Sequence, residues 1–376
     1  MLSVNYNPDV LSCLANLSNA SEEVYSRDEQ LETHAYQFIH TDKPEKVFNM
    51  KFDVIIGNPP YQLSDGGHGT SAAPIYHKFI QQAKKLNPRF LSMIIPARWF
   101  AGGKGLDEFR SEMLNDDRIR KLVDFENSSE VFPGVDVAGG ICYFLWERDS
   151  NGLCEVVTMH NGEKISGERP LNEFSILIRH SQSIPIIRKV LKFEDKKRLS
   201  DIVSSRKPFG LPTNYKPKKE GVPCWFIQKI GLKFADETDI NDRLDLLNKW
   251  KLLIPPAPIA GQTDFSKPVG FYYEGNTRIA KPGECCTESW LVACAFSTKK
   301  EVISFKSYLF TKTVRFLLLQ TVVSQHVTKE KFLFIPDLGE YDKEYTDELL
   351  IKRWKITKEE CSFIDTKIKS VEFSNE

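Results

Sequence analysis

The sequence FDVIIGNPPYQ, residues 52–62, joins a short apolar run to a glycine, an asparagine, two prolines and a tyrosine. A continuous apolar run of this length is typical of a strand that is buried on both faces of a parallel sheet. In open parallel sheets, ligands bind just beyond the carboxyl ends of the strands. Asn58 follows the apolar run directly, so the sequence predicts that it lies at a ligand-binding edge.

The residues after this strand favour a site that accepts hydrogen bonds. Pro59 and Pro60 have fixed φ angles and no N–H donors, so they form a stiff segment with carbonyl acceptors only. Asn58 adds a side-chain carbonyl and Tyr61 adds an aromatic face. These groups suit the exocyclic amino group of a planar base. The alternative is an ordinary proline turn, because N-P is a common turn dipeptide.

Strand and helix patterns alternate along the first part of the chain. Apolar spacing predicts helices at 74–86 and 106–115, strands at 52–56, 90–96, 118–126 and 137–148, and a hairpin between the last strand and residues 154–162. Strands that alternate with helices are the signature of a parallel α/β sheet with crossover helices. We therefore predict an α/β fold for the first domain.

The pattern changes after residue 150. Residues 179–192 predict a connecting helix, and residues 200–300 combine prolines, glycines and aromatic residues with weak periodicity. Further helices are expected at 300–322 and 346–370, with Thr357 and Glu360 spaced as a capping box. The predicted organisation is a first domain at 1–150, a connecting segment at 151–199 and a mixed α+β domain at 200–376.

Charge is balanced over the whole chain, with 51 basic and 51 acidic residues, but two segments are locally basic. In residues 196–220 and 299–331, lysine and arginine far outnumber aspartate and glutamate, which suits a polyanion. The candidates for phosphate contact are Lys207, Lys216, Lys218, Lys219, Lys312 and Arg315. The alternative is that these are the solvated faces of helices and loops.

Cysteine usage and hydropathy indicate a cytoplasmic protein. None of the eight cysteines stands in a C-x-x-C pair, so a zinc site is not expected, and the neighbouring Cys285 and Cys286 are predicted to be packing residues. The start of the chain lacks the pattern of a signal peptide. No apolar stretch is long enough to span a membrane, so no membrane association is expected.

The segment DVIIGNPPY, residues 53–61, resembles the catalytic motif of gamma-class N6-adenine DNA methyltransferases from type II restriction–modification systems. Residues 90–100 (FLSMIIPARWF) and 130–146 (EVFPGVDVAGGICYFLW) resemble later blocks of that family. In the second block, Phe132 matches a phenylalanine that packs against the extruded adenine. The aromatic-rich C-terminal half is similar to a target recognition domain. The resemblance runs from about residue 35 to near the C-terminus.

This resemblance implies a Rossmann-like methyltransferase sheet at 1–150 and a target recognition domain at 200–376. The substrate would be double-stranded DNA, from which the enzyme flips an adenine. Asn58 and the Pro59 carbonyl would accept from its amino group, while Tyr61 stacks on the ring. S-adenosyl-L-methionine would supply the methyl group. A restriction endonuclease or a complementary methyltransferase subunit is a possible partner.

The resemblance is incomplete on the side of the methyl donor. The family binds the donor at a glycine-containing loop upstream of N-P-P-Y, but the first glycine of this chain is Gly57. We expect that a segment was lost near Ser18–Ala20, that the sheet is incomplete at its N-terminal part, and that its strand edge is left unpaired. Asp42 stands where relatives often have an acid facing the donor's adenine, and the alternative for it is a solvated loop acid.

Three other functions fit parts of the sequence. Protein glutamine methyltransferases also carry N-P-P-Y, because a side-chain amide presents a similar planar amino group, but they lack a large C-terminal domain. A non-catalytic DNA-binding specificity remnant, or one half of a split methyltransferase, fits the glycine-free start. A nuclease is suggested by the E-x-K triplet at 194–196. Its neighbours predict no clear strand, which argues against a nuclease.

Overall fold

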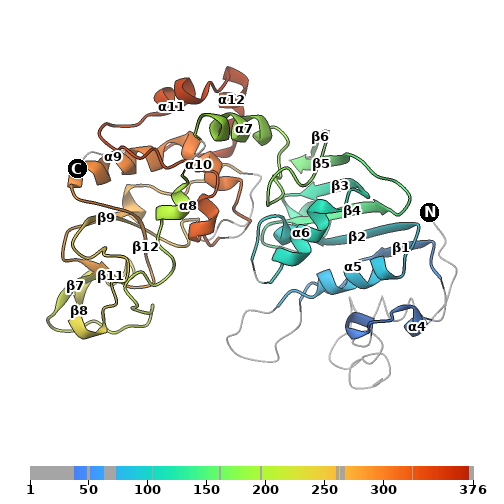
Figure 1. Cartoon of the computed structure of the whole chain (residues 1–376), viewed down its shortest axis with the longest axis horizontal. Coiled ribbons are helices and arrows are strands. Elements are labelled where there is room, and N and C mark those ends of the chain that lie inside the picture. The colour runs from blue at the N-terminus through green and yellow to red at the C-terminus, as the bar shows by residue number, and fades with distance from the viewer. Residues whose placement is uncertain are drawn as a thin grey trace. The chain divides into compact units, whose positions relative to one another are not determined.

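The computed structural model describes residues 38–48, 51–62, 73–103, 105–160, 162–194, 197–259, 262, 267–323 and 325–371. The chain divides into two compact units, Met1–Ser181 and Gln182–Glu376. The division falls inside 151–199, the segment that the sequence assigned to a connection. Figure 1 labels the elements of both units, and each unit is described by itself.

Unit 1 is built on a six-stranded mixed sheet in the order β1-β2-β4-β3-β5-β6. The strands are β1 (Val54–Gly57), β2 (Phe90–Pro96), β3 (Ile119–Phe125), β4 (Ile141–Glu147), β5 (Cys154–His160) and β6 (Glu163–Arg169). The β1–β2 and β3–β5 pairs are parallel, while β4 is antiparallel to both β2 and β3. The predicted α/β, Rossmann-like fold is confirmed, with β4 as an antiparallel insertion (Figure 1).

The predicted hairpin between 137–148 and 154–162 is wrong. Both edges of β4 are occupied, by β2 on one side and β3 on the other, so no edge is left for β5. β5 instead pairs with β3 and with the next strand along the chain, β6. Residues 154–169 therefore belong to the sheet of unit 1 and not to a connecting segment.

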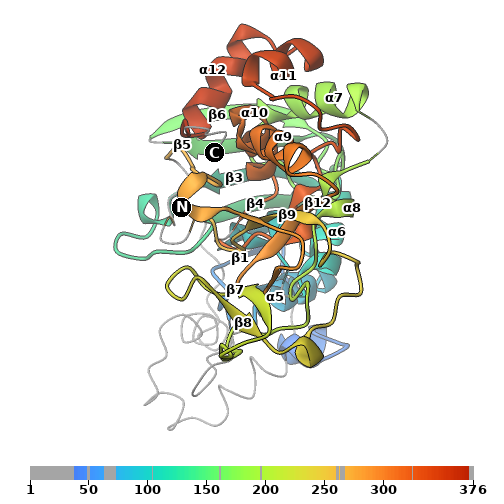
Figure 2. The ribbon, with the colours of Figure 1, turned by 90° about the vertical axis from the view of Figure 1, so that its left-hand side faces the viewer.

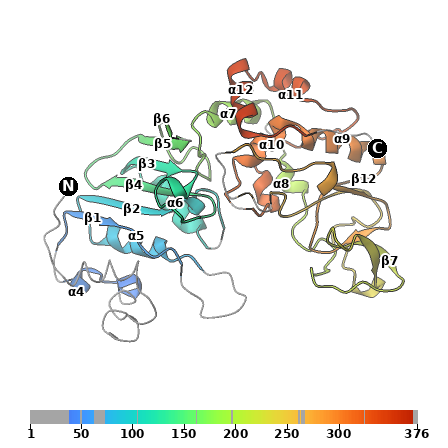
Figure 3. The ribbon, with the colours of Figure 1, turned by 180° about the vertical axis from the view of Figure 1, so that it is seen from behind.

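Helix α5 (Tyr76–Lys85) covers part of the sheet through an apolar face. Tyr76, Phe79, Ile80 and Ala83 recur at helical spacing and are buried. Figure 3 shows α5 running alongside β1 and β2. The other helices of this unit are α4 (Glu45–Phe48) and α6 (Asp107–Asn115), with short 3₁₀ turns at Ala97–Phe100 and Ser128–Glu130.

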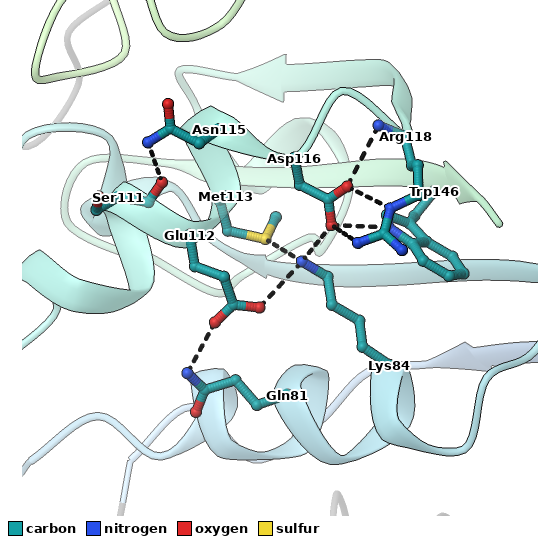
Figure 4. Close-up of polar contacts among 9 residues, drawn as sticks. All are labelled: Gln81, Lys84, Ser111, Glu112, Met113, Asn115, Asp116, Arg118 and Trp146. Carbon is teal, nitrogen blue, oxygen red and sulfur yellow. Dashed lines mark hydrogen bonds and ion pairs between the residues drawn. The ribbon is translucent and has the colours of Figure 1, made fainter. Parts of the chain in front are cut away.

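A buried polar network joins α5 and α6 to the amino end of β3 (Figure 4). Asp116 accepts a hydrogen bond from Arg118 Nε at 2.7 Å and from Trp146 Nε1 at 2.9 Å. Lys84 Nζ lies 2.9 Å from Asp116 and 3.1 Å from Glu112. Burial alone would raise the pKa of Asp116, but the bonds from Arg118 and Lys84 outweigh it and lower this pKa to about 2. The network holds two helices on the sheet.

Unit 2 combines two three-stranded sheets with a group of helices. One sheet has the order β10-β9-β12 and the other β11-β7-β8. The strands are β7 (Val222–Trp225), β8 (Leu232–Ala235), β9 (Trp250–Ile254), β10 (Arg278–Ala280), β11 (Cys285–Cys286) and β12 (Leu291–Phe296). The helices are α7 (Ser183–Phe193), α8 (Leu199–Ile202), α9 (Lys299–Phe310), α10 (Lys312–Leu319), α11 (Asp347–Trp354) and α12 (Lys358–Lys367).

Within unit 2, Figures 1 and 2 show α7 and α9–α12 gathered together, apart from β7 and β8. The predicted helix at 300–322 is broken, because the Thr311 side chain accepts from Val314 N and so caps a new helix, α10. The predicted end at 346–370 is two helices, and α11 ends where Lys355 adopts a φ of 53°. The capping box of Thr357 and Glu360 at the start of α12 is confirmed.

The paired cysteines of β11 are packing residues, as predicted. Cys285 and Cys286 are fully buried in one hydrophobic cluster with Phe209 and Trp290. In the part of the chain that the structure describes, no helix has both the length and the hydropathy needed to cross a bilayer. The same residues contain no cluster of three metal-ligating side chains.

Candidate active site

Asn58 lies immediately beyond the carboxyl end of β1. Strand β1 ends at Gly57, which pairs with Met93 of the parallel strand β2. The Asn58 side chain is exposed, while Pro59 behind it is buried and Pro60 is half-buried. The amide of Asn58 is therefore accessible at the ligand-binding edge of the sheet. Its role toward a base stays a prediction.

Tyr61 is half-buried, and its hydroxyl points away from solvent. Its peptide carbonyl accepts from Ile75 N at 3.2 Å, which ties this corner to the start of α5. The buried hydroxyl has no hydrogen-bond partner among the described residues. Burial, with a smaller contribution from Cys142, raises the pKa of Tyr61 to about 12. The hydroxyl therefore stays protonated at neutral pH, so Tyr61 has no means of acting as a base there.

Phe132 lies in the loop between β3 and β4. β3 runs in the same direction as β1, because β4 is antiparallel to β3 and to β2, so this loop lies at the same edge of the sheet as Asn58. Phe132 is half-buried. Among the described residues, no ring contact joins it to Tyr61, so stacking of both rings on one base stays a prediction.

The loop that carries Phe132 is held by its own hydrogen bonds. Ser128 Oγ donates to the Val135 carbonyl at 2.8 Å and accepts from Val137 N at 2.9 Å. The loop ends at Gly140, which has a φ of +80°. A Cβ at this position would lie 2.2 Å from the Phe125 carbonyl oxygen. Only glycine fits there, which explains one glycine of the AGG segment.

Four polar residues at this edge were missed from the sequence: Asp124, Glu126 and His180 are buried, and Arg179 is half-buried. Arg179 Nε lies 2.6 Å from Asp124 Oδ2, and Arg179 Nη2 donates to the Gly139 carbonyl at 2.5 Å. His180 Nε2 lies 2.9 Å from Glu126 Oε1. A signal was present in the sequence, because the acids Asp124 and Glu126 stand at the carboxyl end of the strand predicted at 118–126. Their partners lie far along the chain, so sequence spacing gave no way to pair them.

The structure describes little of the expected donor site. Asp42 is exposed, and it makes no hydrogen bond or ion pair with the residues that the structure describes. The segment near Ser18–Ala20 lies outside the described residues. In the described sheet, β1 has a single neighbour, and Ile56 on it is 50% exposed. The hydrogen bonds and ion pairs of the described residues do not link Asp42 to any other group, so we assign no donor site to it.

Of the lysines proposed to contact phosphates, Lys216 and Lys219 are exposed. Lys218 is exposed too, with its Nζ 3.9 Å from Asp239 and over the Tyr215 ring. Lys207 Nζ lies 3.7 Å from Glu288. These four residues are available to a ligand, and DNA contact by them stays a prediction.

The assignment of Arg315 to DNA contact is wrong. Arg315 is 1% exposed, and its guanidinium donates to the carbonyls of Phe310 at 2.9 Å and Lys369 at 2.8 Å. Burial lowers its pKa to about 10, so it remains a cation that joins α10 to the C-terminal segment. Lys312 is paired with Asp365, which weakens its case as a phosphate ligand.

Comparison with known proteins supports the resemblance for one part of the chain. Residues 5–132 match the family model of the Eco57I restriction-modification methylases. An uncharacterized adenine-specific methylase of Mycoplasma pneumoniae is 40% identical over 131 residues, which are 32% of this chain and 31% of that protein. The chain thus matches about a third of this relative's length. The match to the family begins earlier than residue 35 and does not extend over the C-terminal half.

Solved structures of similar fold come from restriction–modification enzymes. The type IIG restriction endonuclease BpuSI aligns with 81% of this chain and 48% of its own, at 12% identity and a TM-score of 0.33. The type IIL enzyme MmeI, solved in complex with DNA, aligns with 77% of this chain and 46% of its own, at 11% identity and a TM-score of 0.44. Residues 5–132, which include Asn58, Tyr61 and Phe132, are thus similar to restriction–modification adenine methylases.

Proposed function

We propose that this chain is the adenine-binding part of a site-specific DNA methyltransferase that modifies the N6 amino group of adenine. The observation that carries the proposal is the exposed Asn58, which follows the parallel strand β1 directly and is stiffened by a buried Pro59. An amide at that position has an acceptor oxygen free for an amino group. The family match over residues 5–132 supports this reading.

The roles of the side chains follow from their positions. Asn58 and the carbonyl of Pro59 accept from the two protons of the adenine amino group and so orient its nitrogen. The face of Tyr61 stacks on the flipped base, and stacking of this kind contributes about 1–3 kcal/mol per base. Phe132, from the loop at the same edge, closes on the adenine. No protein nucleophile takes part, and the hydroxyl of Tyr61 stays protonated.

The methyl donor of this family is S-adenosyl-L-methionine, which supplies an electrophilic methyl group. Since the described residues do not form a donor site, we assign none of them to the donor. We infer that this chain alone is inactive or nearly so, and that a complementary chain would have to supply donor binding. The second candidate function is a non-catalytic DNA-binding module, which the missing glycine loop favours.

Transfer of a radiolabelled methyl group to duplex DNA tests the proposal. The assay is run with the chain alone and with the product of the neighbouring gene. In the active arm, Asn58→Ala should lower the transfer rate about 100-fold, as expected when a group that polarises the reacting centre is removed. Gln62→Ala, an exposed change in the same segment, is the matched control and should stay within about twofold of wild type.

Duplex binding is measured on the same variants, and it should be unchanged by Asn58→Ala. Duplex binding without transfer in either arm would favour the non-catalytic module instead. Label appearing in protein and not in DNA would favour the glutamine methyltransferase reading. Equal transfer rates for Asn58→Ala and wild type would refute the role of Asn58.

A further inference from the structure

Unit 2 contains a pocket of about 300 Å³ that lies outside the candidate active site. Trp250 from β9 forms part of its wall, Glu274 comes from the segment before β10, and Arg278 is the first residue of β10. Lys281 follows β10, while Lys299 and Lys306 come from α9. We call it the basic pocket, because four cations line it against one carboxylate. β10 pairs with β9, and α9 packs against β9, so the elements that line the pocket are in contact with one another.

The single acid of the basic pocket is matched by its most buried cation. Lys306 is 3% exposed, and its Nζ lies 2.6 Å from Glu274 Oε2. This pair leaves the charges of Arg278, Lys281 and Lys299 without an acid in the pocket. Lys281 and Lys299 are exposed, and neither forms an ion pair with any described carboxylate. The pocket therefore carries a net positive charge.

Arg278 is held in place by the backbone around it. Its Nη1 donates to the carbonyls of Thr277 at 2.6 Å and Gly275 at 3.1 Å, and its guanidinium lies 5.9 Å from the ring centre of Trp290. A guanidinium has five N–H donors, so several remain for a ligand. A fixed planar donor set matches the oxygen atoms of a phosphate.

We propose that the basic pocket binds a phosphate group, with Arg278, Lys281 and Lys299 as its ligands and Trp250 beside the attached sugar or base. A cavity of about 300 Å³ is at the small end of ligand sites, which suits a phosphate with part of a nucleoside. Two sources share this chemistry, a phosphodiester of DNA and a free nucleotide. The proposal does not depend on methyl transfer, since phosphate binding needs no donor.

Adjacent lysines at the start of α9 provide a matched pair for the test. Lys299 lines the basic pocket, while Lys300 does not, and both are exposed. Lys299→Gln and Lys300→Gln remove the same charge from the same turn of helix, and neither disturbs a buried contact. A difference between them therefore reports on the pocket and not on net charge or folding.

The binding of three probes to the full chain is measured for wild type and both variants: inorganic phosphate, adenosine monophosphate and a short DNA duplex. Lys299→Gln should weaken binding about tenfold, the usual effect of losing one charge-assisted hydrogen bond, and Lys300→Gln by less than about twofold. For the duplex, Lys299→Gln should also lower the salt slope by about 1.

The pattern across probes identifies the source. If only the duplex is bound and only Lys299→Gln weakens it, the ligand is the DNA backbone. If the mononucleotide or inorganic phosphate binds and responds to Lys299→Gln, the ligand is a free phosphate compound. Equal effects of the two variants on every probe, or no binding of any probe, would overturn the proposal. A failure of methyl transfer alone leaves these results unchanged, so the two proposals fail separately.

Discussion

Tyr61 has two separable properties, an aromatic face and a buried hydroxyl without a partner among the described residues. A buried hydroxyl that makes no hydrogen bond costs free energy, so removing it should not destabilise the fold. We expect Tyr61→Phe to keep base capture and to raise the free energy of unfolding by up to about 1 kcal/mol. Urea denaturation measures the stability.

Tyr61→Ala removes the face as well as the hydroxyl. It should weaken capture of the flipped base by about 1–3 kcal/mol. The fluorescence of 2-aminopurine, placed at the methylated position of a duplex, reports this capture directly. Equal signals from Tyr61→Ala and wild type would remove the stacking role.

At the scale of elements, the loop between β3 and β4 depends on Gly140. An alanine there would adopt an unfavourable φ of +80° and would also place its Cβ against the Phe125 carbonyl. We expect Gly140→Ala to destabilise unit 1 by at least about 2 kcal/mol. The matched control is Gly134→Ala, where φ is also +80° but no atom lies within 4 Å of the added Cβ.

Gly134→Ala should cost only the backbone strain, about 1 kcal/mol. Thermal unfolding of both variants checks the difference. A similar cost for the two would mean that the loop relaxes around the added methyl group, against our reading of the close approach at Gly140.

The attachment of α5 and α6 to the sheet should depend on pH through Asp116. Its pKa in the folded state is about 2, below the ordinary 3.8, because bonds from Arg118 and Lys84 overcome the effect of burial. The stabilisation is therefore complete above about pH 4 and is lost as pH falls toward 2. It amounts to about 2 kcal/mol at neutral pH.

Asp116→Asn should remove this acid-dependent part of stability. Asp117→Asn, at the exposed neighbouring acid, should keep it. The urea unfolding midpoints of both variants and of wild type are compared between about pH 5 and pH 2.5, the range over which most of the stabilisation from Asp116 is lost. Parallel acid curves for Asp116→Asn and wild type would contradict the assignment.

At the scale of the whole chain, binding of the methyl donor distinguishes the two candidate functions, an adenine methyltransferase and a non-catalytic DNA-binding module. Without a glycine loop before Gly57, we expect the purified chain to show no micromolar binding of S-adenosyl-L-methionine. Isothermal titration measures this, with duplex DNA as the positive control for folded protein. A dissociation constant in the micromolar range would show that the donor site is present after all.

The sequence by itself determined the elements of unit 1 that surround the site. The apolar run before Gly57 predicted β1, the run FLSMIIP predicted β2 at Phe90–Pro96, and the period of apolar residues predicted α5. The placement of Asn58 at a strand end followed from the same pattern. Such features depend on local periodicity and on the stiffness of proline, so residues that are close together in the sequence determine them.

Only the tertiary structure decided which distant segments meet. β5 pairs with β3 because β2 and β3 occupy both edges of β4. Local sequence patterns do not show which strand edges are already paired. Asp124 forms an ion pair with Arg179, although the two residues are far apart in the sequence. Arg315 is buried because its guanidinium donates to the carbonyls of Lys369 and Phe310. Long-range partners of this kind decide whether a charged side chain is a ligand or a structural tie, and sequence spacing does not contain them.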